Sequence, residues 1–185
     1  MPGRFTILAV CTANICRSPL MEILLRDGLD AERFEVASAG VRGWDAQPMD
    51  PSAAAELARL GHSADGFASR AIASDQVASA DLLLTATREH RSEVLATNPQ
   101  ALRRSFTLLE LAALTELVDG DDPAALVAQA AQRRSLAPAA VDVRDPYRRG
   151  PDVHRATADQ IDVAVATIAR RLNALVPSTV PPTAG

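Results

Sequence analysis

The chain has 185 residues, 48% of them hydrophobic, and a formal net charge of −4 at pH 7. These values suit one globular domain, which we expect over residues 1–176, followed by a flexible Pro-rich tail at 177–185. The negative charge disfavours nucleic acid as a partner, and no stretch approaches the roughly 20 apolar residues of a membrane span. The two cysteines, Cys11 and Cys16, lie too close together to link distant segments, and the chain begins with no recognisable secretory signal. These features predict a reducing, cytoplasmic location.

Strand-like and helix-like segments alternate along the chain, which predicts βαβ units and a parallel sheet. Strands are expected at residues 5–10, 34–38, 81–86 and 104–107. Helices are expected at residues 19–29, 50–60, 74–79, 88–95 and 152–173, the last with apolar residues near a helical period.

The first strand leads directly into the sequence Cys-Thr-Ala-Asn-Ile-Cys-Arg-Ser-Pro, residues 11–19, which predicts a phosphate-binding loop. Ser18 is a favoured N-cap and Pro19 is favoured at the first helical position, so we expect the helix to begin here. The loop N–H groups and the helix dipole would attract an oxyanion, and the planar guanidinium of Arg17 can hold two of its oxygens. The same field favours the reactive thiolate form of Cys11. The alternative, a buried structural cysteine before a solvated helix, explains the order of these residues less well.

This loop resembles the signature Cys-x-Gly-Asn-x-Cys-Arg-Ser-Pro of the low-molecular-weight protein tyrosine phosphatases. The resemblance implies an α/β fold: a four-stranded parallel sheet of order 2-1-3-4 with helices on both faces, a Rossmann-like three-layer sandwich with the phosphate loop after strand 1. It also implies that Cys11 is the nucleophile and that the Ser18 hydroxyl stabilises its thiolate. The phosphate would be held by the side chain of Arg17 and by the backbone of Thr12, Ala13, Asn14, Ile15, Cys16 and Arg17.

Two positions depart from the family pattern. Ala13 stands where the signature has Gly, and it is tolerable if its φ stays negative. Asn14 suits the loop because asparagine tolerates the left-handed region. Family members often carry a histidine near Phe67 that supports the loop asparagine, and this chain lacks it.

A second motif, Asp145-Pro146-Tyr147, is predicted to be a surface loop, because Pro146 biases Asp145 away from helix. Alone, Asp-Pro is an ordinary turn signal. In the resembled family an Asp-Pro-Tyr or Asp-Pro-Trp loop carries the general acid, which implies that role for Asp145. Tyr147 would then form an aromatic wall of the substrate pocket. The resemblance also places Trp44 beside this pocket, whereas the alternative for Trp44 is packing under a loop.

An extra segment of helical character, about residues 108–140, lies between the fourth strand and Asp145. We expect helices at residues 109–117 and 124–134. Asp122 with Pro123 predicts a capped helix start rather than a calcium loop, since the later glycine and glutamate of an EF-hand are missing.

The combined prediction is a cysteine-dependent phosphatase that hydrolyses phosphotyrosine in proteins through a phosphocysteine, with no cofactor. The three histidines show no metal spacing, so no metal is expected. Cys16 either forms a reversible disulfide with Cys11 or is a small core residue.

Three alternatives remain open. An arsenate reductase would need a small external thiol, because no cysteine follows Cys16. A protein-arginine phosphatase is less favoured, since such relatives carry Thr where this chain has Ile15. A non-enzymatic phosphate-binding module would need neither Cys11 nor Asp145.

Overall fold

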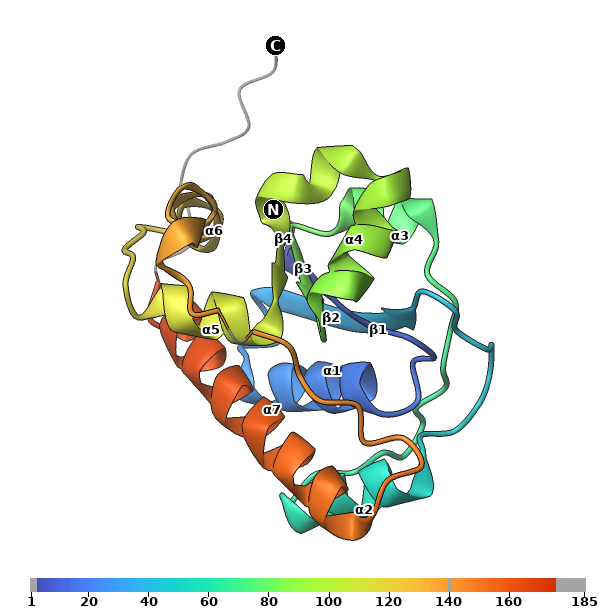
Figure 1. The fold of residues 1–185 in the computed structure, drawn as a ribbon. Coiled ribbons are helices and arrows are strands. Elements are labelled where there is room, and N and C mark those ends of the chain that lie inside the picture. Colours follow the sequence, from blue (N-terminus) through green and yellow to red (C-terminus); the bar gives the residue numbers. More distant parts are fainter. Residues whose placement is uncertain (1–2, 140, 176–185) are drawn as a thin grey trace.

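The computed structural model describes residues 3–139 and 141–175. Its centre is a four-stranded parallel sheet of order β2-β1-β3-β4, which confirms the predicted topology (Figure 1). The strands are β1 (Phe5–Cys11), β2 (Phe34–Gly40), β3 (Leu82–Thr85) and β4 (Ser105–Thr107). Cys11 is the last residue of β1, so the predicted nucleophile lies at the carboxyl edge of the sheet, beside the point between β1 and β3 at which the strand order reverses. Open α/β sheets bind ligands at this edge.

Helices cover both faces of the sheet, as Figure 1 shows. On one face lie α1 (Arg17–Gly28), α2 (Pro51–Arg59) and α7 (Pro151–Asn173). On the other lie α3 (Ser74–Ser79), α4 (Arg88–Thr97) and the 3₁₀ helix η1 (Pro99–Arg104). The segment after β4 forms α5 (Leu108–Thr115), α6 (Pro123–Gln132) and the 3₁₀ helix η2 (Arg134–Leu136). The three-layer arrangement is therefore as predicted, while η1 was not.

The core consists of two clusters, one on each face of the sheet. Successive side chains of β1 point to opposite faces and therefore belong alternately to the two clusters. Ile7, Ala9 and Cys11 belong to the larger cluster, which α1, α5 and α7 complete. Leu8 and Val10 belong to the smaller cluster, with residues of α3, α4 and η1. The sulfur of Cys11 thus lies on the α1 side of the sheet.

The predicted start of α1 is wrong by two residues. The helix begins at Arg17, its N-cap is Cys16 without a side-chain cap, and Pro19 is the third helical residue. Ser18 does not cap the helix because its hydroxyl contacts Cys11 and Asn14 instead. The first N–H groups of α1 are left without a capping side chain, which suits the anion predicted to bind there.

The extra segment has the two predicted helices. Each begins one residue earlier and ends two residues earlier than predicted. Asp122 accepts a hydrogen bond from the Ala125 N–H and caps α6, with Pro123 at the first position, as predicted.

The division into a domain at 1–176 and a tail at 177–185 stays a prediction, since the tail lies outside the described residues. Within residues 3–139 and 141–175, none of the helices has the length and apolar character that crossing a membrane requires.

Gly40, at the end of β2, allows the phosphate loop to lie close against the sheet. A Cβ at this position would meet the Thr12 carbonyl oxygen at 2.6 Å and the Asn14 nitrogen at 2.9 Å. Both are backbone atoms, which can move only if the loop moves.

We predict that Gly40→Ala destabilises the protein by about 1–3 kcal/mol, the usual cost of overpacking, and distorts the loop. Gly28→Ala is the matched control. Its Cβ would meet only the Ala169 Cβ at an ordinary 3.5 Å. Its stability should be unchanged or slightly raised, because alanine favours helix. Urea denaturation of both variants is the measurement, and equal stability of the two would contradict this account of Gly40.

Candidate active site

The loop between β1 and α1 wraps around a single point, and Asn14 makes the turn. Asn14 has a φ of 58°, in the left-handed region that asparagine tolerates. Among the described non-glycine residues, positive φ values occur at Asn14, Ala46 and Arg148. Ala13 therefore keeps a negative φ, and its replacement of the signature glycine introduces no backbone strain there.

The side chain of Asn14 is buried and fully used in holding the loop. Its Nδ2 donates to Ser38 Oγ at 2.7 Å and to Ser18 Oγ at 2.9 Å, while its Oδ1 accepts from the Arg70 N–H at 2.9 Å. These contacts support the asparagine in a chain without a histidine near Phe67. The sequence did not identify Ser38 or Arg70 as supports of this loop.

The Cys11 sulfur lies close to the hydroxyl of Ser18, with 3.0 Å between Cys11 Sγ and Ser18 Oγ. Asn14 donates to the Ser18 oxygen, so the Ser18 hydrogen can be donated either to the sulfur at 3.0 Å or to the Ala39 carbonyl at the longer distance of 3.5 Å. A hydroxyl donating to sulfur stabilises the thiolate relative to the thiol. The predicted contact between Ser18 and Cys11 is therefore present in the structure.

Arg17 places a buried charge beside this sulfur. The residue is 4% exposed. Its Nη1 donates to the Val143 carbonyl at 3.2 Å, and its Nη2 donates to Thr12 Oγ1 at 3.4 Å. Nη2 also lies 3.4 Å from Asp145 Oδ1, which joins two motifs far apart in the sequence. Within the described part of the chain, the buried Arg17 Nε has no hydrogen-bond partner. A buried guanidinium nitrogen without a partner is costly unless a ligand accepts from it.

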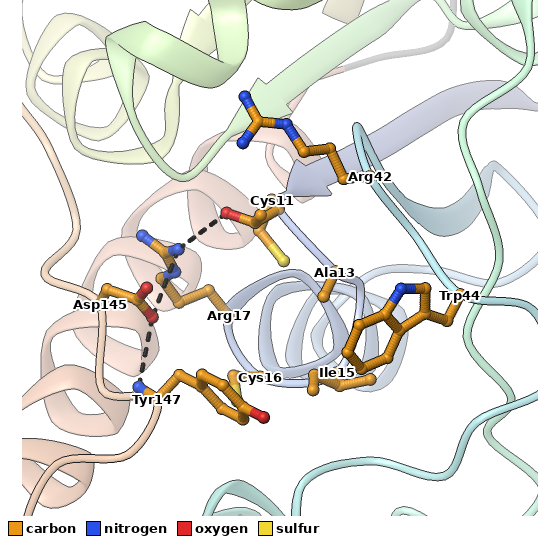
Figure 2. A pocket seen from close by; sticks show the side chains of 10 residues that line it. Cys11, Ala13, Ile15, Cys16, Arg17, Arg42, Trp44, Asp145 and Tyr147 are labelled. Atoms are coloured by element: carbon orange, nitrogen blue, oxygen red, sulfur yellow. Dashed lines mark hydrogen bonds and ion pairs between the residues drawn. The ribbon is translucent and has the colours of Figure 1, made fainter.

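These groups line a cavity of about 370 Å³ (Figure 2). Trp44 and Tyr147 lie on opposite sides, and the Cys11 sulfur points into the space between them. Trp44 is 61% exposed and Tyr147 38%, so both rings are open to solvent beside the cavity. Trp44 is thus a pocket residue, not packing under a loop. The lining residues are Cys11, Thr12, Ala13, Ile15, Cys16, Arg17, Arg42, Trp44, Asp145 and Tyr147.

Cys16 lines the same cavity but differs chemically from a nucleophile. It is 4% exposed and both cysteines are free. Burial, then the negative charges of Asp50 and Cys11, raises the pKa of Cys16 far above that of an ordinary thiol. Cys16 is therefore an uncharged thiol at neutral pH, which does not suit it to act as a nucleophile.

Two lining or supporting residues, Arg42 and His90, were missed by the sequence reasoning. Arg42 follows β2 and its exposed side chain pairs with Glu93 at 3.2 Å. His90 in α4 lies 2.8 Å from Thr12 Oγ1 through Nε2 and 2.8 Å from Thr87 Oγ1 through Nδ1. The available signal was position, because both residues follow the carboxyl ends of strands that meet at one edge.

Burial and the nearby charge of Arg17 lower the pKa of His90 to about 4, from an ordinary value of 6.5. His90 is therefore neutral at physiological pH. Each of its ring nitrogens faces one threonine hydroxyl. A neutral imidazole has one donor and one acceptor nitrogen, so His90 orients Thr12 without adding positive charge to the site.

The lowered pKa of His90 predicts a pH dependence of stability. The unfolded chain binds this proton as pH falls through about 6.5, whereas the folded protein resists it down to about pH 4. The stability contribution is complete above pH 6.5 and declines below it, by on the order of 2 kcal/mol at about pH 4.5. His90→Gln should lose less stability than wild type over this range in urea denaturation. If NMR shows that the imidazole of His90 itself titrates near pH 6.5, the prediction is contradicted.

Comparison with known proteins identifies the family. The model of the family "Low molecular weight phosphotyrosine protein phosphatase" matches residues 6–129. The low molecular weight protein-tyrosine-phosphatase Etp of Escherichia coli K12 is 41% identical over 104 residues, 56% of this chain and 68% of that protein. A protein-arginine-phosphatase of Bacillus subtilis is 27% identical over 168 residues, 90% of this chain and 95% of that protein.

Solved structures agree in fold. The YwlE arginine phosphatase from Geobacillus stearothermophilus superimposes with a TM-score of 0.71 at 25% identity, covering 91% of this chain and 92% of that one. The family match ends before Asp145, whose place in the site comes from the geometry described above. The chain belongs to the low-molecular-weight phosphotyrosine protein phosphatases, a family of cysteine-dependent hydrolases.

Proposed function

We propose that this phosphatase hydrolyses phosphotyrosine in proteins through a phosphocysteine intermediate. The observation that carries the proposal is the convergence of three groups in one cavity: the Cys11 sulfur, the Arg17 guanidinium, whose Nε has no partner among the described residues, and the Asp145 carboxyl group. A nucleophile, an anion-binding group and a proton donor are what phosphate ester cleavage needs.

In the first step the Cys11 thiolate attacks phosphorus, the phosphorus–oxygen bond to the aryl group breaks, and Asp145 protonates the departing oxygen. Arg17 and the backbone N–H groups of residues 12–17 hold the other phosphate oxygens as charge shifts onto them. In the second step Asp145 accepts a proton from a water molecule that attacks the phosphocysteine. Ser18 stabilises the departing thiolate through its 3.0 Å contact.

The walls of the cavity favour an aryl phosphate. Trp44 and Tyr147 flank the space on two sides, and the apolar side chain of Ile15 lines it as well (Figure 2). A phenyl ring between two aromatic rings buries apolar surface and stacks favourably. The proposed partner is a phosphorylated protein, without nucleic acid or membrane, and the proposed location is the cytoplasm.

Phosphoarginine is the second candidate substrate, because relatives that align over most of this chain are named protein-arginine-phosphatases. Ile15 argues against it. The guanidinium of phosphoarginine is polar, and an apolar wall provides no hydrogen bond to it. Arsenate reduction stays a third possibility, and it would require an external thiol because Cys16 is the last cysteine of the chain.

The deciding experiment compares kcat/KM for a phosphotyrosine peptide, a phosphoarginine peptide of the same sequence, and arsenate with glutathione. We predict that phosphotyrosine is preferred and that Cys11→Ser abolishes its turnover while the circular dichroism spectrum is unchanged. A serine hydroxyl is a much weaker nucleophile than a thiolate. Activity of Cys11→Ser within a few-fold of wild type would refute the mechanism, and a preference for phosphoarginine would refute the substrate assignment.

A further inference from the structure

Residues 141–143, here called the acid-loop strap, lead the chain into the Asp145 loop and are held at each position. Val141 and Val143 are buried, at 5% and 1% exposure, while Asp142 faces outward. The Val141 carbonyl accepts from Thr107 Oγ1 at 2.7 Å. The Val143 N–H donates to the carbonyl of Ala86, the residue that follows β3, at 2.8 Å. The strap is therefore attached to the residue that follows β3 and to the last residue of β4.

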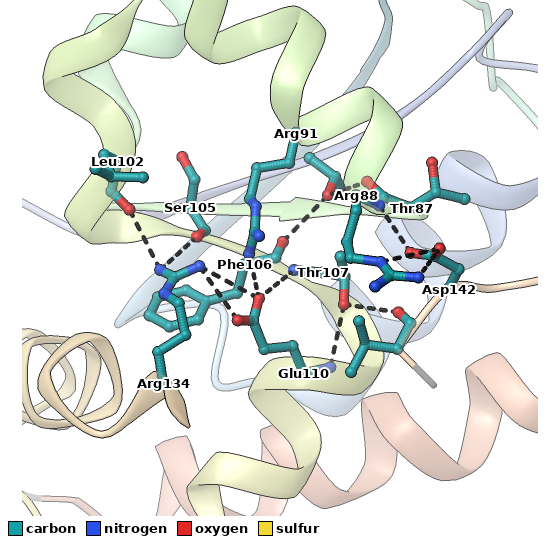
Figure 3. A network of polar contacts seen from close by, with 12 residues as sticks. Thr87, Arg88, Arg91, Leu102, Ser105, Phe106, Thr107, Glu110, Arg134 and Asp142 are labelled. Carbon is teal, nitrogen blue, oxygen red and sulfur yellow. Dashed lines mark hydrogen bonds and ion pairs between the residues drawn. The ribbon is translucent and has the colours of Figure 1, made fainter. Parts of the chain in front are cut away.

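Asp142 makes the side-chain attachment of the strap. Its Oδ1 accepts from the backbone N–H of Arg88 at 2.8 Å, and its Oδ2 accepts from Arg88 Nε at 3.2 Å and Nη2 at 3.1 Å (Figure 3). Arg88 is the first residue of α4, so the carboxylate also faces the positive end of that helix. A two-pronged contact with an additional backbone bond has defined geometry, unlike most surface ion pairs.

Partial burial would by itself raise the pKa of Asp142, but the backbone and side-chain hydrogen bonds from Arg88 outweigh it and lower the pKa below the ordinary value. The carboxylate is accordingly ionised at neutral pH, and the ion pair is present under the conditions in which the enzyme works.

The helix that holds Asp142 is itself fixed to the site. His90, in the same first turn of α4, contacts Thr12 of the phosphate loop. One turn further, Arg91 pairs with the buried Glu110 of α5, which also pairs with Arg134 (Figure 3). Helix α4 thus contacts both the phosphate loop and the extra segment. The bond between Asp142 and Arg88 therefore links the strap to a helix that is itself fixed beside the phosphate loop.

Asp145 has few contacts of its own. Its side chain is 56% exposed, and its contacts are Arg17 Nη2 at 3.4 Å and the N–H of Tyr147 at 3.2 Å. Arg17 in turn donates to the Val143 carbonyl, the last residue of the strap. The position of the Asp145 carboxylate therefore depends on the chain that precedes it, which is held by the strap and by Thr157 Oγ1, which donates to the Arg144 carbonyl at 3.4 Å.

We propose that the Arg88–Asp142 ion pair is a positioning device for the general acid: it fixes the acid-loop strap to α4 and thereby holds Asp145 over the phosphate loop. This inference rests on the proposed role of Asp145. Neither Arg88 nor Asp142 lines the cavity, so both act through Asp145.

The experiment compares poor and good leaving groups, because proton donation matters most when the departing oxygen is basic. Asp142→Asn keeps an oxygen for the Arg88 N–H and removes the charge, while Arg88→Met removes the guanidinium and keeps the N–H. Each should lower kcat/KM for phenyl phosphate by roughly three- to tenfold, the scale of one well-formed surface pair, and change 4-nitrophenyl phosphate by less than about twofold. The double variant should resemble the more damaged single variant, since both remove one interaction.

Arg170→Met and Glu116→Gln are matched controls. This pair has an Nη2–Oε1 distance of 2.8 Å and similar exposure, and it joins α7 to the end of α5. In the control variants kcat/KM should equal the wild-type value for both substrates. Vanadate inhibition should stay at the wild-type level in the Asp142 and Arg88 variants, because the phosphate loop is intact.

Asp145→Asn, measured alongside, separates the two levels of the argument. Its kcat/KM should fall by on the order of 10²–10⁴-fold for phenyl phosphate and by much less for 4-nitrophenyl phosphate. If Asp145→Asn shows this selectivity while the Asp142 and Arg88 variants lose activity equally on both substrates, or lose none, the positioning inference is overturned alone. A uniform loss in Asp145→Asn overturns the assignment of the acid, and the inference with it.

Discussion

A buried guanidinium is the constraint around which this phosphatase is organised. Arg17 is 4% exposed, and within the described chain its only carboxylate partner is Asp145, 3.4 Å away and largely in solvent. Removing a charge from water costs several kcal/mol unless it is paired and hydrogen-bonded. Among the described residues Arg17 Nε has no partner and no side chain caps the first N–H groups of α1, an arrangement that suits an oxyanion. A bound phosphate group would supply the acceptor that the fold itself does not provide.

The parallel sheet explains why residues far apart in sequence meet at this guanidinium. All strands of a parallel sheet end at the same edge, so the end of β1 and the segments after β2 and β3 bring Cys11, Arg42 and His90 to one place. The Asp145 loop is added by the strap beside β3 and not by a strand of the sheet. Helix α4 connects these parts, because its first two turns contact the phosphate loop, the strap and the extra segment.

Local sequence signals predicted the alternating strands and helices and the loop at residues 11–19, whereas the sheet order and the place of Asp145 were implied by the resemblance to the family. The start of α1 was mispredicted for a physical reason: Ser18 is a good cap in general, but here its hydroxyl is used by Cys11 and Asn14. Residues that support others through tertiary contacts, such as Ser38, Arg88 and His90, carry no local signal. Their roles depend on partners between 24 and 78 positions away.

Vanadate inhibition of Arg17→Lys tests the central claim most directly, since vanadate occupies a phosphoryl site without requiring turnover. Lysine keeps the charge but lacks the planar pair of donors, so affinity should fall by on the order of 10²-fold. Arg26→Lys in the same helix, where Arg26 is half exposed beside Asp27, should bind vanadate as wild type does. Equal inhibition of Arg17→Lys and wild type would contradict the account, because the guanidinium would then not hold the oxyanion.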